Sequence, residues 1–523
     1  MARFSGLAII VGGGILVGLI ACNGPTSTTV PNVAPKIVSF SADSEGVAAA
    51  RFAWSVSDPD GDSLTCALDV DNDAIDDVSI GDCLTVASHL HSYGTPGLYE
   101  ARLSANDGHG HTVFATTHAI ANGTDATPPS WLRQFGSADT DTAAAVAATG
   151  GNVAVAGSTS GSLGGYANAG LDDVFIARFG ALGTSLWVRQ LGTSAADNGY
   201  GVAADSVGNV LVTGRTLGAL PGEVNLGGAD AFLAKVDVQG KLLWVRQFGS
   251  SATDEGHGVA ADNHGNVFVV GNTAGTLPGQ FSAGLADVFV AKFDGQGNLL
   301  WSRQFGSGNG DFANDVAVDG DGNAFLTGTT YAALPGQVSA GGADAFVAKV
   351  DAQGNVVWIR QFGSGAGDTG EGVAVGAAGV VVVAGSTSGA LPGQASAGGF
   401  DAFVALYSAG GSASWRHQFG TASSDYGRTV ALDAMGHVAV AGETDGAMDG
   451  HVNLGGLDGY VAKVDSGGNP VWVRQFGSSA SEFLGGVTID GGANVVAAGY
   501  TGGTLPGQTS LGGGDAYLVA YLP

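Results

Sequence analysis

Apolar and polar residues recur with one fixed period over the last three quarters of this chain. A tryptophan followed by a variant of Arg-Gln-Phe-Gly returns at intervals of 56 or 57 residues. The tryptophans are Trp131, Trp187, Trp244, Trp301, Trp358, Trp415 and Trp472. Such a period indicates one repeated supersecondary unit that is too small to bury its own apolar face and needs its neighbours.

Each copy of the repeat contains four strand-like segments. In one copy, residues 258–262 form a short strand, and residues 267–272 form an apolar run typical of a strand buried on both faces. A long loop with Gly and Pro leads to residues 287–294, and a Gly-Gln-Gly-Asn turn leads to residues 299–305. Four antiparallel strands in one such period are typical of a propeller blade. The sequence therefore predicts an all-β fold with a seven-bladed β-propeller.

The two ends of the repeat region predict how the ring closes. The first copy begins at Trp131 with its fourth strand alone, and the last copy ends at 516–522 with its third strand. We expect residues 131–135 to complete the seventh blade, which removes an open sheet edge. An aspartate opens every third strand, and we expect it to pair with the arginine of the adjacent fourth strand. Arg133 and Asp515 would form this structural pair at the closure.

The segments before the repeats differ in composition. Arg3 precedes an apolar run over residues 7–20, which fits an export signal better than a spanning helix. A small domain with strand-like alternation at 49–56 and 98–106 follows a tether rich in Thr and Pro. The predicted divisions are a signal peptide at 1–21, a tether at 22–34, a small β-domain at 35–121, a linker at 122–130 and the propeller at 131–523.

Three cysteines remain to be explained. Cys66 and Cys83 lie in the small domain, and in an exported chain we expect a disulfide between them, with two buried free thiols as the alternative. Cys22 ends the segment Leu-Ile-Ala-Cys, which resembles the bacterial lipoprotein signal. That resemblance implies a lipid on Cys22 that tethers the protein to a membrane. A plain signal peptide or an uncleaved anchor is the alternative.

Three stretches resemble known families. Residues 91–107 resemble the signature of PKD domains, which are Ig-like β-sandwiches of bacterial surface proteins, and residues 54–62 resemble cadherin or PKD modules more loosely. The Trp-x-Arg-Gln-Phe-Gly core and the Gly-Gly-x-Asp-Ala-Phe segment at 341–346 resemble the SBBP family of bacterial β-propeller repeats. This resemblance implies a propeller and an extracellular location, but no chemistry.

Charge excludes one class of partner. The chain has 47 acidic and 19 basic residues, which gives a net charge of −28. Most of the basic residues recur at two repeat positions, so few remain to form a basic patch. We therefore expect no nucleic-acid binding.

Two acidic patterns are candidate calcium sites. The first is a set of acids in the loops that enter the innermost strands, which we expect to surround one mouth of the central channel. This set is Asp141, Asp197, Asp254, Asp311, Asp368, Asp425 and Glu482. Asx turns, calcium binding and a rim that attracts cations or partners all remain open for it. The second is the segment from Asp69 to Asp77, in which Asp69, Asp71, Asp73 and Asp77 have calcium-loop spacing but Ala74 replaces the turn glycine, so a solvated acidic loop is the alternative.

The copies diverge three residues after each of these loop acids. The side chains there are candidates for ligand binding on the face where both long loops of each copy open, although neutral drift would produce the same divergence. The candidates with a functional side chain are Tyr200, His257, Asn314, Glu371 and Arg428, and Ala144 and Gly485 complete the set.

The function expected from the sequence is that of a non-catalytic, monomeric lipoprotein at the outer surface of a bacterial cell or its outer membrane. Its lipid alone would contact the membrane, and the long-loop face would bind a protein or a glycan. Calcium is the one candidate cofactor. The alternatives are an extracellular hydrolase or lyase that acts on polysaccharides at the propeller mouth, and a purely structural spacer. An enzyme needs a nucleophile or an acid–base pair held together, and no spacing argument gathers residues from different copies.

Overall fold

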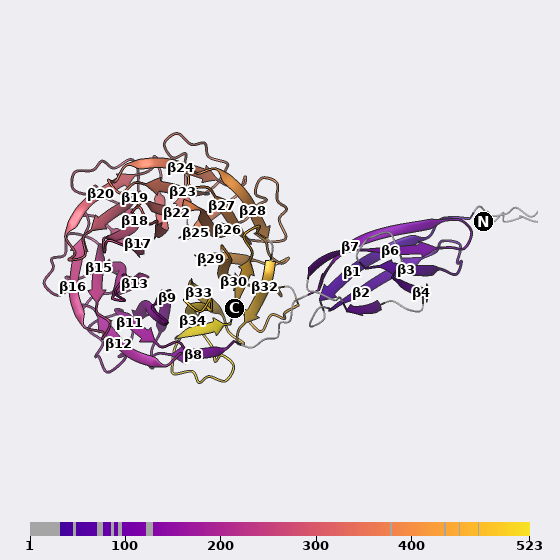
Figure 1. Ribbon diagram of the computed structural model, residues 1–523, viewed down its shortest axis with the longest axis horizontal. Helices are drawn as coiled ribbons and strands as arrows, with labels where there is room; N and C mark the ends of the chain where they lie inside the picture. The colour runs from indigo at the N-terminus through magenta and orange to yellow at the C-terminus, as the bar shows by residue number, and fades with distance from the viewer. Residues whose placement is uncertain are drawn as a thin grey trace, which may run out of the picture. The chain divides into compact units, whose positions relative to one another are not determined.

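A computed structural model describes residues 32–44, 49–70, 77–84, 88–92, 97–121, 129–376, 379–433, 436–448, 450–468 and 470–522. The regular elements in these residues are strands, and the described chain offers no helix suited to crossing a membrane. The chain divides into two compact units, a smaller one that includes β3 and β4 and a larger one that includes β8–β35 (Figure 1). The signal peptide, Cys22, nearly all of the tether and most of the linker lie outside the described residues.

The N-terminal region forms two sheets, with strand orders β1-β2-β5 and β4-β3-β6-β7. The strands are β1 (Lys36–Ser44), β2 (Ala49–Ser57), β3 (Thr65–Asp69), β4 (Val78–Asp82), β5 (Ser88–Ser92), β6 (Gly97–Asn106) and β7 (Thr112–Ala121). The strands predicted at 49–56 and 98–106 are confirmed to within one residue. Cys66 and Cys83 are both buried and form a disulfide with a Cα–Cα distance of 5.5 Å.

The described residues from 131 to 522 form seven four-stranded sheets arranged in a closed ring. The innermost strand of each sheet contacts that of the next, and β33 returns to β9. These strands are β9 (Asp141–Thr149), β13 (Asp197–Ala204), β17 (Asp254–Ala261), β21 (Asp311–Val318), β25 (Asp368–Val375), β29 (Asp425–Leu432) and β33 (Glu482–Ile489). We number the sheets 1 to 7 in this order.

The second and third strands of each sheet form its buried centre. The second strands are β10 (Asn152–Thr159), β14 (Val210–Thr216), β18 (Val267–Thr273), β22 (Ala324–Thr330), β26 (Val381–Thr387), β30 (Val438–Thr444) and β34 (Val495–Thr501). The third strands are β11 (Asp173–Phe179), β15 (Asp230–Val236), β19 (Asp287–Phe293), β23 (Asp344–Val350), β27 (Asp401–Tyr407), β31 (Asp458–Val464) and β35 (Asp515–Tyr521). Their side chains are almost all buried on both faces, as the continuous apolar runs predict.

The fourth strands lie at the outside of the ring. They are β12 (Ser185–Leu191), β16 (Leu242–Phe248), β20 (Leu299–Phe305), β24 (Val356–Phe362), β28 (Ala413–Phe419), β32 (Pro470–Phe476) and β8 (Trp131–Phe135). The strand β8 pairs antiparallel with β35, so the first strand of the ring completes sheet 7, as predicted. The closure gives sheet 7 the same four-stranded order as its neighbours.

The tryptophan and arginine of the repeat join neighbouring sheets. Trp187 Nε1 in sheet 1 donates a hydrogen bond of 3.0 Å to the carbonyl oxygen of Val238, in the turn between the third and fourth strands of sheet 2. Arg189 donates to the carbonyl oxygen of Gly240 in the same turn, at 3.2 Å. Gly240 has a φ of +87°, and a Cβ there would lie 2.9 Å from the Trp187 ring, so only glycine fits beneath the tryptophan. The tryptophan and arginine of the motif therefore hold adjacent sheets together at the outside of the ring.

The expected pairing of the third-strand aspartate with the arginine is wrong. The glutamine that follows the arginine donates a hydrogen bond to the aspartate instead. At the closure, Gln134 Nε2 donates to Asp515 Oδ2 at 2.8 Å. The physical reason is register: Arg133 lies opposite Leu518, three residues beyond Asp515, and so points to the other face of the sheet. Arg133 donates to the carbonyl oxygen of Gly183 in sheet 1.

The same correction holds in every sheet. The aspartate–glutamine pairs, with distances of 2.7 to 2.8 Å, are Asp173–Gln190, Asp230–Gln247, Asp287–Gln304, Asp344–Gln361, Asp401–Gln418, Asp458–Gln475 and Asp515–Gln134. His417, which replaces the arginine in sheet 5, therefore does not weaken the partner of Asp401.

A buried ion pair lies near the opposite, short-turn face of some sheets. In sheet 2, Lys235 Nζ lies 2.9 Å from Asp205 Oδ2, and both side chains are less than a tenth exposed. Lys292 and Asp262 are at 3.7 Å in sheet 3. Such a pair is costly to break, because the remaining charge stays buried without its partner.

Candidate ligand-binding site at the central channel

The divergent positions of the repeat are β-bulges. In every sheet, one residue of the innermost strand has no partner on the second strand, and the register shifts there by one. In sheet 2, Gly199 faces Gly214 and Gly201 faces Thr213, which leaves Tyr200 without a facing residue. The seven bulge residues are Ala144, Tyr200, His257, Asn314, Glu371, Arg428 and Gly485. A bulge redirects one side chain per sheet, so these are the positions where each sheet presents a different group.

The bulge also explains why a predicted strand began too late. The sequence predicts the innermost strand of sheet 3 from residue 258, but β17 starts at Asp254. The extra residue, His257, interrupts the alternation of apolar and polar positions. The apolar pattern becomes readable only beyond the bulge.

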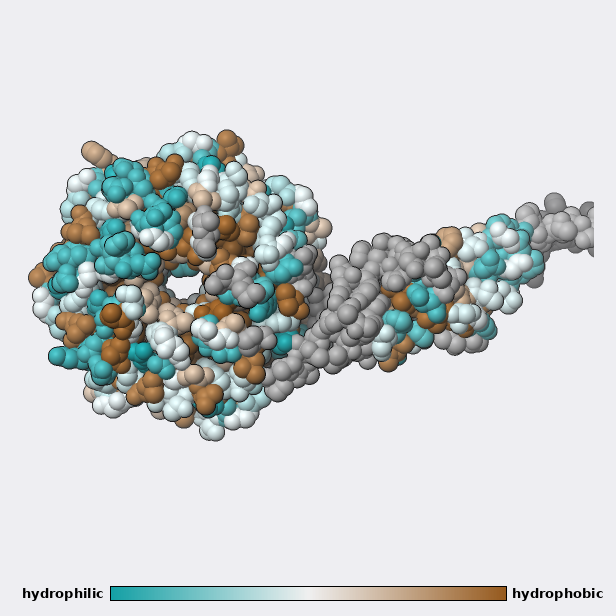
Figure 2. All heavy atoms as spheres, viewed as in Figure 1, coloured by the Kyte–Doolittle hydropathy of each residue, from teal (hydrophilic) through white to brown (hydrophobic). Residues whose placement is uncertain are grey.

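All seven bulge residues line one cavity along the axis of the ring. The cavity has a volume of about 140 Å³, and its walls come from the innermost strands of every sheet. Figure 2 shows the opening at the centre of the ring. The structure thus gathers five candidates separated by multiples of about 57 residues into one site, which the repeat spacing did not predict.

The sheets contribute different kinds of side chain to the wall of the channel. Sheets 2 to 6 contribute the long polar side chains, while sheets 7 and 1 contribute only glycine, alanine and valine residues, among them Gly485 and Ala144. A Cβ on Gly485 would lie 2.5 Å from the carbonyl oxygen of Ala144, so these two strands approach closely. The polar groups therefore face a side of the channel that is lined by small or apolar residues.

Sheets 2 and 3 form one polar cluster. The rings of Tyr200 and His257 stack with centroids 5.2 Å apart, and His257 Nε2 lies 2.9 Å from Asn272 Oδ1. Glu255 forms ion pairs with Arg215 at 2.5 Å and with His257 at 3.6 Å. The hydrogen bond with His257, together with Arg215, lowers the pKa of Glu255 to about 2 against the opposing effect of burial.

Sheets 4 to 6 form a second polar cluster. Asn314 Nδ2 donates to the carbonyl oxygen of Gly370 at 2.8 Å and lies 3.4 Å from Glu371 Oε2. Arg428 lies between two carboxylates, at 3.7 Å from Glu371 and at 2.9 Å from Glu443. Burial raises the pKa of Glu443 to about 7, although Arg428 favours its charged form.

Aromatic side chains gather near the long-loop end of the same strands. The residue after each loop acid, two positions before the bulge, is Phe312 in sheet 4, Tyr426 in sheet 6 and Phe483 in sheet 7. Each has an aromatic neighbour. The pairs are Phe312–Tyr331 at 6.1 Å, Phe400–Tyr426 at 5.2 Å and Phe483–Tyr500 at 4.7 Å between ring centroids. These positions were not predicted from the sequence, although their divergence within the repeat could have indicated them.

The loop acids do not surround the channel mouth, so this expectation is wrong. All seven are fully buried inside the sheets. Asp311 shows their role: its Oδ2 accepts the Ser307 N–H at 2.6 Å, and its Oδ1 accepts the Thr330 hydroxyl at 2.5 Å. Because one carboxylate oxygen of each of the seven acids accepts the N–H of the residue four positions earlier, the geometry favours the turn interpretation over calcium. Their burial excludes an exposed charged rim.

These buried acids give a prediction for pH dependence. Burial raises the pKa of Asp311 above its usual 3.8, and the charge of Asp287 adds to the shift. A raised pKa in the folded state gives stability that is complete below 3.8 and is lost as pH rises through the folded value. We expect the stability of the native protein relative to Asp311→Asn to fall as pH rises above 3.8.

Thermal unfolding of both proteins across this range checks the prediction. Asp351→Asn is the matched control, because hydrogen bonds from Asn355 lower the pKa of Asp351 and reverse the sign. A stability difference for Asp311→Asn that does not change with pH would contradict a raised pKa.

The acidic segment of the N-terminal region is only partly described. Asp71 and Asp73 lie outside the described residues. Asp69 is buried and forms an ion pair with Arg102 at 3.2 Å, and Asp77 Oδ2 accepts the Val70 N–H at 2.9 Å. Calcium binding by this segment stays a prediction.

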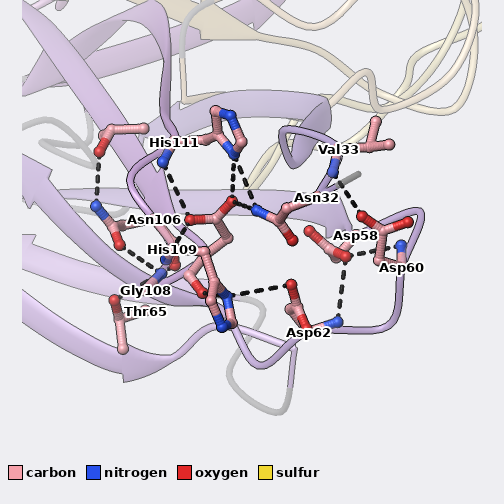
Figure 3. Close-up of polar contacts among 12 residues, drawn as sticks. Asn32, Val33, Asp58, Asp60, Asp62, Thr65, Asn106, Gly108, His109 and His111 are labelled. Atoms are coloured by element: carbon pink, nitrogen blue, oxygen red, sulfur yellow. Dashed lines mark hydrogen bonds and ion pairs between the residues drawn. The ribbon is translucent and has the colours of Figure 1, made fainter. Parts of the chain in front are cut away.

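A different acidic cluster in the N-terminal region was not predicted. Asp58, Asp60 and Asp62 each place a carboxylate oxygen within 4.8 Å of the others (Figure 3). Asp58 Oδ1 accepts the N–H groups of Asp60 and Asp62, and Asp62 lies 3.3 Å from His109 Nδ1. The Asp-Pro-Asp-Gly-Asp spacing could have indicated this cluster, whose backbone hydrogen bonds are those of a tight acidic turn.

Comparison with known proteins supports the propeller. Residues 186–221, 243–277 and 300–334 match the SBBP family, described as a beta-propeller repeat. Each match covers the fourth strand of one sheet and the first two strands of the next. The chain is therefore a β-propeller repeat protein, as the sequence predicts.

Two curated proteins show partial similarity. Regulatory protein FlaEY of Caulobacter vibrioides is 25% identical over 263 residues, which cover 47% of this chain and 27% of that protein. An uncharacterized WD repeat-containing protein of Acanthamoeba polyphaga mimivirus is 23% identical over 198 residues, which cover 30% of this chain and 14% of that protein. The chain thus spans only a small part of the length of these relatives.

Solved structures show distant similarity. A puromycin hydrolase aligns with a TM-score of 0.43 and 14% identity over 71% of this chain and 53% of that one. A Synechocystis apocarotenoid oxygenase aligns with a TM-score of 0.39 and 10% identity over 74% and 94%. A rhamnogalacturonan lyase aligns with a TM-score of 0.33 and 14% identity over 92% and 89%. These values assign no activity to this chain.

Proposed function

We propose that this β-propeller repeat protein is a non-catalytic, exported surface lipoprotein that binds a glycan at the long-loop mouth of its channel. In this proposal the seven sheets are the blades of the propeller. The N-terminal region is a PKD-like spacer, and a lipid on Cys22 anchors the protein. The observation that carries the proposal is the presence of partly exposed aromatic pairs beside the polar bulge residues.

This combination suits a saccharide. Sugar rings offer apolar C–H faces that pack on aromatic rings, and hydroxyl groups that need donors and acceptors nearby. The mouth supplies three aromatic pairs, and the channel below it supplies Asn314, Glu371 and Arg428. A cavity of about 140 Å³ suits one small polar group. A protein partner would instead need roughly 800 Å² of contact on each side.

A polysaccharide-acting hydrolase is the second candidate function, and one observation favours it. Glu443 and Glu371 flank Arg428, and the pKa of Glu443 is raised to about 7, as suits a general acid. Against this, Glu443 is only 1% exposed and Arg428 covers it, so a substrate has no direct path to its proton. Release of new reducing ends from surface polysaccharides would establish the hydrolase and overturn the non-catalytic proposal.

We expect Tyr331→Ala to weaken glycan binding by about tenfold, because an exposed ring at a binding site supplies a large contact at little cost to folding. Tyr331 is 56% exposed and contacts Phe312. Isothermal titration of the full chain with oligosaccharides selected on a glycan array measures the effect.

Phe281→Ala is the matched control for this prediction. Phe281 is 89% exposed in the loop between β18 and β19 and does not line the channel. Its loss should leave glycan affinity unchanged. A loss of affinity in Phe281→Ala but not in Tyr331→Ala would contradict recognition at the channel mouth.

A further inference from the structure

We infer that the sugar group entering the channel carries hydrogen-bond donors and a neutral or positive charge, with Glu371 as the residue that sets this specificity. The inference rests on the proposed function and goes beyond it, because it names the class of glycan. Amino sugars and neutral sugars are then ligands, and uronates are not.

The balance of charge at the channel supports this inference. Among the described residues of the two polar clusters, Arg215 pairs with Glu255 and Arg428 lies between Glu371 and Glu443, so each guanidinium group already has a carboxylate partner. The whole chain adds a net charge of −28, which repels an anionic polymer before it reaches the mouth. A carboxylate-bearing sugar would therefore need a cation that is still available.

Both arginines already have carboxylate partners. Arg215 Nη1 lies 2.5 Å from Glu255, and its Nε lies 3.2 Å from Asn198 Oδ1. Arg428 Nε is within 3.2 Å of both carboxylate oxygens of Glu443, which is buried. An incoming carboxylate would have to share a guanidinium group whose charge a carboxylate of this chain already balances.

Glu371 is the acceptor that retains free capacity. Its Oε1 lies 3.7 Å from Arg428 Nη1, and its Oε2 lies 3.4 Å from Asn314 Nδ2. Both distances exceed those of a good charge-assisted hydrogen bond, so the carboxylate can accept better-placed donors. Its side chain is 22% exposed and lines the channel. An ammonium or hydroxyl group of a sugar supplies the donor that Glu371 lacks.

The test compares three oligosaccharide series of equal length with the full chain: β-1,4-linked glucosamine, its N-acetylated form and oligogalacturonate. We expect measurable affinity for the first two, at least about tenfold weaker binding of the uronate, and tighter binding of the amino sugar than of the acetylated one. Glu371→Gln should reduce the preference for the amino sugar over its acetylated form by about fivefold.

Glu223→Gln is the matched control, because Glu223 is also 22% exposed and lies 3.8 Å from an arginine, Arg246, but does not line the channel. The Glu223→Gln variant should prefer the amino sugar over its acetylated form to the same degree as the native protein. Uronate binding as strong as that of the neutral sugar, or an unchanged preference in Glu371→Gln, would overturn the inference while the proposed glycan function stands. Binding of none of the three series would overturn both.

Discussion

Replacement of Gly328 by alanine is expected to destabilise the propeller by about 2–4 kcal/mol. Gly328 lies on β22 opposite the bulge of sheet 4. A Cβ there would lie 1.9 Å from the carbonyl oxygen of Phe312 and 2.9 Å from Cα of Ala313. Both atoms belong to the backbone of β21, so the strands must separate to admit the methyl group.

The same constraint recurs in every sheet. A Cβ at the corresponding glycine would lie 1.7 to 1.9 Å from a backbone carbonyl oxygen of the innermost strand. These glycines are Gly157, Gly214, Gly271, Gly328, Gly385, Gly442 and Gly499. The close approach is what allows the innermost strand to bulge and present its side chain to the channel, so loss of the glycine should also disturb the candidate site.

Calorimetric and guanidinium unfolding of the full chain measure this effect. Gly320→Ala is the control, since no atom lies within 4 Å of its Cβ position and its φ is not in the left-handed region. The control should remain within about 0.5 kcal/mol of the native protein. Equal stability of the two variants would show that the bulge does not require glycine.

Replacement of Lys235 by leucine is expected to cost about 3 kcal/mol. The change leaves Asp205, whose side chain is 5% exposed, without the cation 2.9 Å away. Burial raises the pKa of Asp205, but hydrogen bonds from Lys235 and Asn209 lower it below its usual 3.8 overall. A lowered pKa gives stability that is present above 3.8 and lost as pH falls through the folded value, so the cost of the substitution should shrink at acidic pH.

The chain contains its own control for this pair. Sheet 5 has Gly376 and Leu406 at the two positions, so both charges are absent together. The double variant Asp205→Gly with Lys235→Leu should therefore lose less unfolding free energy than the sum of the losses in the two single variants. Additive effects in a double-mutant cycle of chemical unfolding would show that the two charges are not coupled.

Much of the fold was readable from the pattern of residues. Strand β20 was predicted with its exact bounds in residues 299–305, and the closure by residues 131–135 followed from incomplete first and last copies. These features depend on local alternation and on counting copies. Neither needs knowledge of which side chains meet.

Predictions of side-chain contacts failed where a shift of one residue in strand register decides which side chains meet. Arg133 was placed with Asp515, but the odd spacing of their register puts them on opposite faces, and Gln134 takes the aspartate. Asp311 was expected at the channel mouth with a turn, a calcium site and a charged rim left open, and the structure favours the turn, because a serine and a threonine enclose the carboxylate inside the sheet. Hydrogen-bonding partners of this kind cannot be read from spacing alone, because a bulge or a tight turn shifts the count by one.

The sequence by itself determined that this protein is a ring of repeated four-stranded units with seven positions that differ between copies. Only the tertiary structure decided that these seven positions are bulges around one channel. The physical reason is that the sequence of one repeat determines the strands and turns within that unit, through the alternation of apolar and polar residues and through its turn residues. The contact between Glu371 and Arg428 depends instead on how the units pack around the ring, because the two side chains come from neighbouring sheets.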